Sequence, residues 1–291
     1  MPGPEADVGR LTDTNYWDAK YGAGAGNSTG EPPIPRRTAL AKRLLGHGIA
    51  DWTEDYSDYL LWETVYRLHM PRGPGVKVLE VGSAPGDHLV RLHRTFALEP
   101  YGVEFSERGV LVNRERFAKQ GLNCENVIQA DFFSPDFHRK YAGAFDVVVS
   151  RGFIEHFTDV HAVLAKHVGL LRSGGHLFVT IPNLRGIYRA LTWFFNREAL
   201  SRHNLEIMRL SSFRHLFTGH RVSPVLCGYY GTFTFGIVGT SDGAVVRRWL
   251  FLGCAALQQV LNPLFHLMFG ARGAENPFTS PYLIFVGVKR D

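Results

Sequence analysis

The stretch Val76–His88 constrains the fold of this chain more than any other. Its first part is an apolar run that predicts a buried parallel strand over 76–81. A short turn of small residues follows, and Asp87 is placed to cap a helix expected over 87–96. Because glycines let the backbone approach a ligand closely, a strand, a glycine-rich turn and a helix N-terminus together predict a cradle for a small molecule.

The acids of this stretch indicate the charge of the ligand. Glu80 stands near the tip of the strand and Asp87 at the start of the helix. A dinucleotide pyrophosphate prefers a helix N-terminus without an anion beside it, and Ala84 and Asp87 replace glycines of the G-x-G-x-x-G pattern. The stretch therefore favours a ligand with an ammonium and a sulfonium group. The alternative interpretation is an ordinary strand–turn–helix with a stray acid.

Strands and helices alternate along the rest of the chain, which predicts an α/β, Rossmann-like, doubly wound and mostly parallel sheet. Seven strands are expected, and those after the first cover 101–106, 127–132, 145–150, 176–181, about 222–229 and 282–289. In such sheets the ligand crevice lies beyond the carboxyl ends of the strands. Polar side chains at four strand ends should therefore meet there: Glu80, Glu104, Asp131 and Ser150.

Two of these acids have expected partners in a nucleoside. Glu104 can accept hydrogen bonds from both ribose hydroxyls, and Asp131 can accept from an adenine amino group. Phe105 and Phe132 are available to cover the adenine ring. Solvated acids at strand ends are the alternative, since they are common in α/β proteins.

The motif Glu80-x-Gly82-x-x-x-Gly86 resembles the first motif of class I S-adenosylmethionine (SAM) dependent methyltransferases. Residues 145–157 and 171–183 look most like the branch of that superfamily that acts on small molecules and on quinone- or lipid-like substrates. The resemblance covers about 76–183 and implies SAM as the cofactor. The residues that it implies in SAM binding are Glu80, Gly82, Ser83, Ala84, Gly86, Glu104, Phe105, Asp131, Phe132 and Ser150.

Two departures from related families narrow the implied substrate. Nucleobase amino methyltransferases carry Asn/Asp-Pro-Pro-aromatic after the fourth strand, where this chain has 150–153, Ser-Arg-Gly-Phe, so nucleic acid is disfavoured. Some quinone O-methyltransferases bind a metal through Glu-x-x-Glu-His. Here Gly152 replaces the first acid, and we expect no metal.

An oxygen nucleophile benefits from a base during methyl transfer, and a neutral histidine suits that role. His156 follows Glu155 just after the fourth strand and is the expected general base or substrate orienter. The alternative is that both residues only begin the next helix. O-methylation of a small, partly apolar metabolite is the expected activity. N- or C-methylation and a non-catalytic SAM-binding or scaffold protein are the alternatives, and an NAD-dependent oxidoreductase is disfavoured.

The remaining segments flank this core. Residues 1–72 are expected to form an N-terminal tail and helical cap, and 73–291 the SAM-binding domain, with helical insertions over 184–220 and 240–278. Aromatic and polar residues from the tail, the fourth strand and the first insertion are the candidate acceptor contacts: Trp17, Tyr21, Arg151, Trp193 and His203.

Within the stretch 241–270, residues 249–257 have no polar side chain, but the wider stretch is interrupted by Gln258, Gln259, Asn262, Pro263 and His266. Because a membrane span needs ~20 apolar residues, this stretch does not predict one. It is interpreted as a buried or homodimer-forming helix, a lid over an apolar substrate, or a peripheral membrane contact through 245–269 that uses Arg247 and Arg248. Three cysteines without a C-x-x-C motif and an N-terminus unlike a signal peptide predict a cytoplasmic protein.

Overall fold

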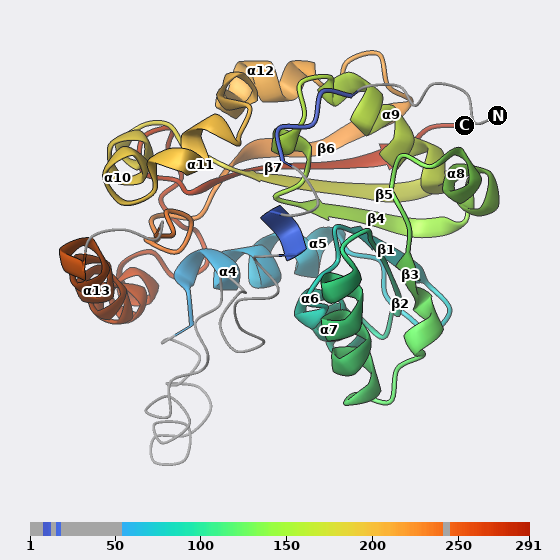
Figure 1. Cartoon of the computed structure of the whole chain (residues 1–291), viewed down its shortest axis with the longest axis horizontal. Helices are drawn as coiled ribbons and strands as arrows, with labels where there is room; N and C mark the ends of the chain where they lie inside the picture. The colour runs from blue at the N-terminus through green and yellow to red at the C-terminus, as the bar shows by residue number, and fades with distance from the viewer. Residues whose placement is uncertain (1–7, 13–15, 19–53, 241–244) are drawn as a thin grey trace.

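The computed structural model describes residues 8–12, 16–18, 54–240 and 245–291, and one seven-stranded sheet organises them (Figure 1). The strands are β1 (Lys77–Val81), β2 (Glu99–Glu104), β3 (Val127–Gln129), β4 (Phe145–Arg151), β5 (Leu171–Pro182), β6 (Val222–Tyr230) and β7 (Tyr282–Lys289). Their order is β3-β2-β1-β4-β5-β7-β6. The predicted Rossmann-like fold is confirmed, but the sheet is mixed, since β7 runs antiparallel to both β5 and β6.

Helices cover both faces of this sheet (Figure 1). Between the parallel strands lie α6 (Asp87–Phe96), α7 (Glu107–Ala118), the 3-10 turn η3 (Cys124–Asn126), α8 (Pro135–Tyr141), the 3-10 turn η4 (Ile154–His156) and α9 (Val160–Leu170). Residues of β1 divide between two buried clusters: Val78 packs with α6 and α7, and Leu79 with α8 and α9. Burial on both faces explains why this strand is apolar without alternation.

The described part of the N-terminal cap is one helical unit, made of α4 (Tyr56–Leu60), the π-helical turn η2 (Leu61–Tyr66) and α5 (Arg67–His69). Asp55 caps its start by accepting hydrogen bonds from the N–H groups of Ser57 at 2.9 Å and Asp58 at 3.3 Å. Trp62 and Tyr66 pack into the cluster that lies under α6. The cap thereby brings side chains to the carboxyl edge of β1.

Both predicted helical insertions are present. Between β5 and β6 lie α10 (Ile187–Phe195), α11 (Arg197–Ser201), the 3-10 turn η5 (Leu205–Met208) and α12 (Leu210–His215), and between β6 and β7 lies α13 (Val245–Phe269). Figure 1 shows α10, α13 and α4 at one end of the molecule, away from α8.

His167 of α9 is buried beneath the residues that follow β3 and β4. Its ring lies 4.7 Å from that of Phe132 and 5.8 Å from that of Phe153, and its Nδ1 bonds the carbonyl of Val163 at 2.8 Å. Burial lowers the pKa of His167 to about 4. The folded protein therefore holds this ring neutral at a pH at which the unfolded chain protonates it.

We expect His167→Leu to reduce the acid sensitivity of folding. Between about pH 6.5 and 4 the unfolded wild-type chain binds a proton here that the folded chain does not, so its free energy of unfolding falls as the pH drops. The variant should lose about 2 kcal/mol less than the wild type between pH 7 and pH 5 in urea unfolding. The exposed His215→Leu is the control. Equal pH dependence in all three proteins would contradict the prediction.

Candidate active site

A cavity of about 410 Å³ lies at the carboxyl ends of β1, β2, β3 and β4. Its walls also include α4, η2, the start of α6 and the N-terminal segment. Most of the predicted cofactor residues line it: Glu80, Gly82, Ser83, Ala84, Gly86, Glu104, Phe105, Asp131 and Phe132. Ser150 does not, because it is fully buried inside the sheet, between Val81 of β1 and Val179 of β5.

The turn after β1 requires its glycines. Gly82 has a φ of +71°, and a Cβ there would lie 3.2 Å from the ring of Phe153. Gly86 has a φ of +95°, and a Cβ there would lie 2.2 Å from Oδ1 of Asn113. Asn113 in turn donates a hydrogen bond to Oγ of Ser83 at 2.7 Å. The turn is therefore held in a shape that leaves its backbone open to a ligand.

The cap position of α6 is occupied by Gly86, without a side-chain hydrogen bond. The expected cap by Asp87 is therefore wrong: Asp87 is the first helical residue, and its carboxylate pairs with Arg116 at 2.9 Å. It nevertheless lines the cavity as the sequence suggested.

Three backbone hydrogen bonds orient Glu104 in the cavity. Its Oε1 accepts hydrogen bonds at 3.0 Å from the N–H groups of both Phe105 and Ser106, and its Oε2 accepts one at 3.3 Å from Ala84. The residue is 4% exposed. Backbone donors thus fix a carboxylate at the position expected to meet a ribose.

Glu80 belongs to a buried chain of polar groups. Its Oε1 lies 2.9 Å from Nδ1 of His88, whose Nε2 lies 3.0 Å from the hydroxyl of Tyr66. Burial lowers the pKa of His88 despite the nearby Glu80 carboxylate. In the described part of the chain, Oε2 of Glu80 is buried without a hydrogen-bond partner. A cationic group of a bound ligand would suit this side of the cavity.

Three arginines also line the cavity, so its acids alone do not determine the charge of the ligand. Arg10 pairs with Asp131 at 2.5 Å, and Arg91 pairs with Asp58 at 2.6 Å. The side chain of Arg151, at the end of β4, makes no hydrogen bond or close ion pair with the described residues, although the nearby charges of Asp58 and Glu80 help to raise its pKa. The site therefore suits a ligand with charges of both signs, and Arg151 is available for an anionic group.

Sequence reasoning missed Arg10, His88 and Arg91 as cavity residues. For two of them a signal was available, because His88 and Arg91 stand three positions apart in the first turns of α6 and so share one helix face. Arg10 offered no such signal, since its partner Asp131 stands 121 positions later in the sequence.

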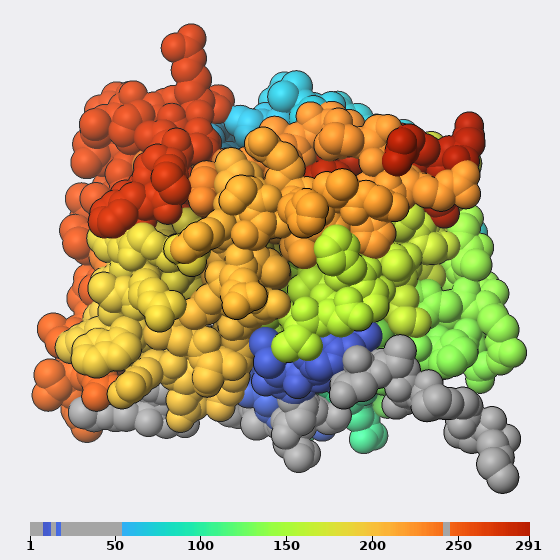
Figure 2. Space-filling model, turned by 90° about the horizontal axis from the view of Figure 1, so that it is seen from above, coloured from blue at the N-terminus to red at the C-terminus, as the bar shows by residue number. Residues whose placement is uncertain are grey.

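The N-terminal segment lies across one side of the cavity. Arg10 forms an antiparallel bridge with Phe157, and the ring of Trp17 contacts that of His156 edge-on at 5.3 Å. The guanidinium of Arg202 lies 4.7 Å from the ring centre of Tyr16. Figure 2 shows this blue segment directly against yellow-green and gold parts of the chain. Of the predicted acceptor contacts in the tail, Trp17 lines the cavity and Tyr21 lies outside the described residues.

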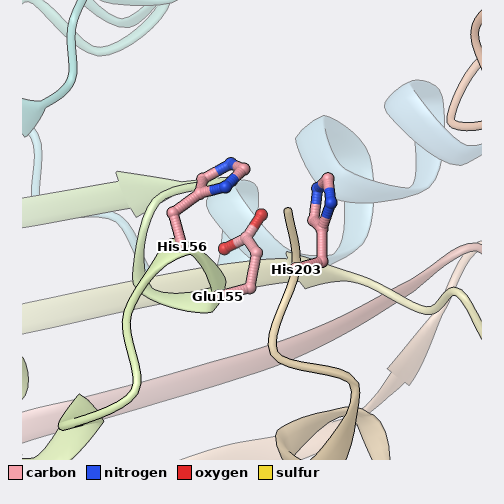
Figure 3. Close-up of side chains that lie close together, drawn as sticks. All are labelled: Glu155, His156 and His203. Carbon is pink, nitrogen blue, oxygen red and sulfur yellow. The ribbon is translucent and has the colours of Figure 1, made fainter. Parts of the chain in front are cut away.

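His156 lines the cavity, and the structure places it next to Glu155 and His203 (Figure 3). Its Nδ1 lies 2.8 Å from the carbonyl oxygen of Arg202, and Nδ1 of His203 lies 2.6 Å from that of Ala199. A carbonyl only accepts, so each Nδ1 carries a proton. In the neutral rings, each Nε2 is then the basic nitrogen.

The same three side chains could also bind a divalent cation. One ligand atom from each of Glu155, His156 and His203 lies within 4.8 Å of the others, and the Glu155 carboxylate lies between the two rings (Figure 3). A backbone partner on the second ring nitrogen is typical of metal-bound histidine. The sequence did not show that His203 lies close to His156. The absence of a metal, expected because of Gly152, stays a prediction.

Two predicted acceptor contacts do not line the cavity. His203 lies behind His156, with the two rings 4.6 Å apart. Trp193 is 57% exposed on α10, because Tyr188 and Phe195 form the buried face of that helix. Arg151, by contrast, lines the cavity as expected.

Comparisons with known proteins agree with this geometry. Residues 51–220 match a family model described as a methyltransferase domain. The structure is similar to a putative methyltransferase complexed with the Trm112 activator of Haloferax volcanii (15% identity, 96% of this chain and 98% of that chain, TM-score 0.51). It is also similar to geranyl diphosphate C-methyltransferase from Streptomyces coelicolor (15% identity, 91% of this chain and 88% of that chain, TM-score 0.52).

A putative sarcosine dimethylglycine methyltransferase from Galdieria sulphuraria is a further similar structure (15% identity, 81% of this chain and 85% of that chain, TM-score 0.50). The comparison with curated proteins found no match. At these identities the structural similarities show the fold, and the family model shows membership of the family.

We expect Glu104→Gln to weaken the binding of SAM, the cofactor that the sequence indicates. The amide can accept fewer hydrogen bonds and carries no charge, so the Kd should rise about tenfold or more. Isothermal titration calorimetry measures the change. The control is Glu107→Gln, an exposed acid in the first turn of α7. A Kd for Glu104→Gln within about twofold of the wild-type value would contradict this role.

Proposed function

Because the chain belongs to the methyltransferase-domain family of class I SAM-dependent enzymes, we propose that it methylates an oxygen atom of a small, partly apolar metabolite. SAM is its cofactor and supplies a methyl group on a sulfonium, already activated for in-line displacement. The protein must then align the acceptor, exclude water and take up the proton of the acceptor oxygen.

The cavity residues divide the binding of SAM among them. The turn that contains Gly82 and Gly86 admits the ligand close to the backbone, and Glu104 accepts hydrogen bonds from the ribose hydroxyls. Asp131 is the proposed acceptor for the adenine amino group. The unsatisfied Oε2 of Glu80 supports the fit, since SAM carries positive charge and this buried oxygen has no partner in the described part of the chain.

The contact between Nδ1 of His156 and the carbonyl oxygen of Arg202 is the observation that carries the proposal. The Nδ1–H of His156 is donated to the Arg202 carbonyl, which leaves Nε2 as the basic nitrogen of a ring that lines the cavity. In the proposed step, Nε2 takes the proton of the acceptor hydroxyl as the new oxygen–carbon bond forms and the sulfur–carbon bond breaks. A neutral thioether and a methyl ether are the products.

The other side chains of the cavity support the acceptor class. Trp17, Trp62, Phe153 and Phe157 line it and would cover an apolar portion of the acceptor. Arg151 would bind a polar or anionic group of the same molecule. N- or C-methylation is the alternative, and NMR of the methylated product identifies the atom that received the methyl group.

We expect His156→Gln to reduce kcat by about 10²–10⁴-fold, the usual contribution of a general base. The Kd for SAM should stay unchanged. An acceptor is first found by incubating metabolite extracts with the enzyme and isotopically labelled SAM. The exposed His215→Gln is the control. Turnover by His156→Gln that equals the wild-type rate at saturating acceptor would exclude the base role.

We expect Arg151→Met to raise the KM for the acceptor by about tenfold or more, because a charged hydrogen-bond partner is lost. The exposed Arg108→Met of α7 is the matched control. Steady-state kinetics with each substrate varied in turn separate the two ligands. A rise confined to the KM for SAM would show that Arg151 binds the cofactor instead.

A further inference from the structure

The amphipathic pattern of α13 is inverted. Its buried residues are polar and follow one helix face: Gln258, Asn262 and His266. Its exposed residues include ten large apolar side chains, which we call the outer face of α13: Val245, Val246, Trp249, Leu250, Leu252, Leu257, Val260, Leu264, Leu267 and Met268. Trp249 and Leu267 are 70% and 74% exposed. A helix on the surface of a soluble protein normally shows the opposite pattern.

The polar face of α13 is bound to the rest of the protein. The side chain of Gln258 accepts a hydrogen bond from the Phe235 N–H at 3.1 Å, and Asn262 accepts one from the Tyr56 N–H at 3.3 Å. The ring of His266 lies 4.3 Å from that of Tyr59. These contacts fix the orientation of the helix, so its apolar face cannot turn inward without breaking them.

The apolar surface continues onto α10. Phe195 of α10 packs against Phe251 of α13 at 5.8 Å, and the two helices share one end of the molecule (Figure 1). Trp193 and Phe194 of α10 are 57% and 43% exposed. We define the outer face of α13 together with these two aromatics as the apolar end of the protein.

The length of α13 is compatible with a membrane. Within the described residues it is the helix long and apolar enough to cross one, by length and composition. A core helix passes the same test, but only 17% of the most apolar window of α13 is buried. Crossing the bilayer would separate Gln258 and Asn262 from their partners, so a contact parallel to the bilayer surface fits better.

The charges around the apolar end favour anionic lipid over a second copy of the chain. Residues 245–269 contain no acid, Arg247 and Arg248 are exposed at the start of α13, and Arg272 is exposed just after it. Arg197 lies 5.8 Å from the ring centre of Trp193. Two copies joined through this surface would bring arginines together with no carboxylate of α13 to pair them.

We propose that the apolar end lies in the surface of an anionic lipid bilayer, as an interfacial helix flanked by arginines. Apolar side chains, with Trp249 and Trp193 among them, enter the boundary between headgroups and acyl chains, and Arg247 and Arg248 contact lipid phosphates. This contact also positions the cavity, since Tyr56, which bonds Asn262, directly follows the cavity residue Asp55. An acceptor dissolved in the bilayer could then reach the site, a step that rests on the proposed function.

Vesicle co-sedimentation of the full chain tests the membrane contact without any assay of activity. Wild-type protein should bind vesicles of phosphatidylcholine with phosphatidylglycerol at least about tenfold more tightly than vesicles of phosphatidylcholine alone. The double variant Trp249→Glu with Leu267→Glu should lose most of this binding. The matched control is Leu111→Glu, which changes a 58% exposed leucine on α7 and should bind like the wild type.

A second variant, Arg247→Glu with Arg248→Glu, should lose the preference for anionic vesicles. An unchanged Kd for SAM shows that each variant is folded. Wild-type protein that binds neither vesicle, or variants that bind like the wild type, would overturn the proposal. So would a stable dimer in sedimentation velocity that the double apolar variant converts to monomer, because this surface would then join two copies.

Discussion

The hydrogen bonds to Glu104 join the parts of the structure that form the site. Its carboxylate accepts from Ala84 in the turn after β1 and from Phe105 and Ser106 at the end of β2. Ser106 then caps α7 through the Gly109 N–H and donates to Asp18 of the N-terminal segment. Glu104 thus aligns two strand ends, because an unsatisfied carboxylate would be costly in that position, and Ser106 extends this network to the start of α7 and to the N-terminal segment.

Residues whose environment is set locally were predictable from the sequence. The apolar run of β1 reads as buried because both sheet faces are covered, and the order of strand-end acids follows from the parallel alternation. The direction of β7 was not predictable, since an apolar strand carries no sign of its orientation. The meeting of His156 with His203, and of Arg10 with Asp131, depends on packing between distant segments that no periodicity reports.

The charges of the cavity were also predictable only in part. Glu80 and Glu104 line the cavity as predicted, because they stand near the carboxyl end of β1 and at that of its parallel neighbour β2. The arginines reach it from a tail, a helix and the strand β4, so their combined effect emerges only in the fold. A cavity that contains both signs of charge can hold the ammonium, sulfonium and carboxylate of one amino-acid-derived ligand, whereas carboxylates alone would repel its acidic end.

The reversed strand β7 has a consequence for how the chain can be extended. β6 and β7 form a hairpin whose last pair, Tyr230 with Tyr282, lies at the same edge of the sheet as the carboxyl end of β5. Residues added between two neighbouring antiparallel strands need no new crossover of the sheet. The connection between β6 and β7, which contains α13, can therefore be lengthened, and its helix replaced, while the strand order of the sheet stays as it is.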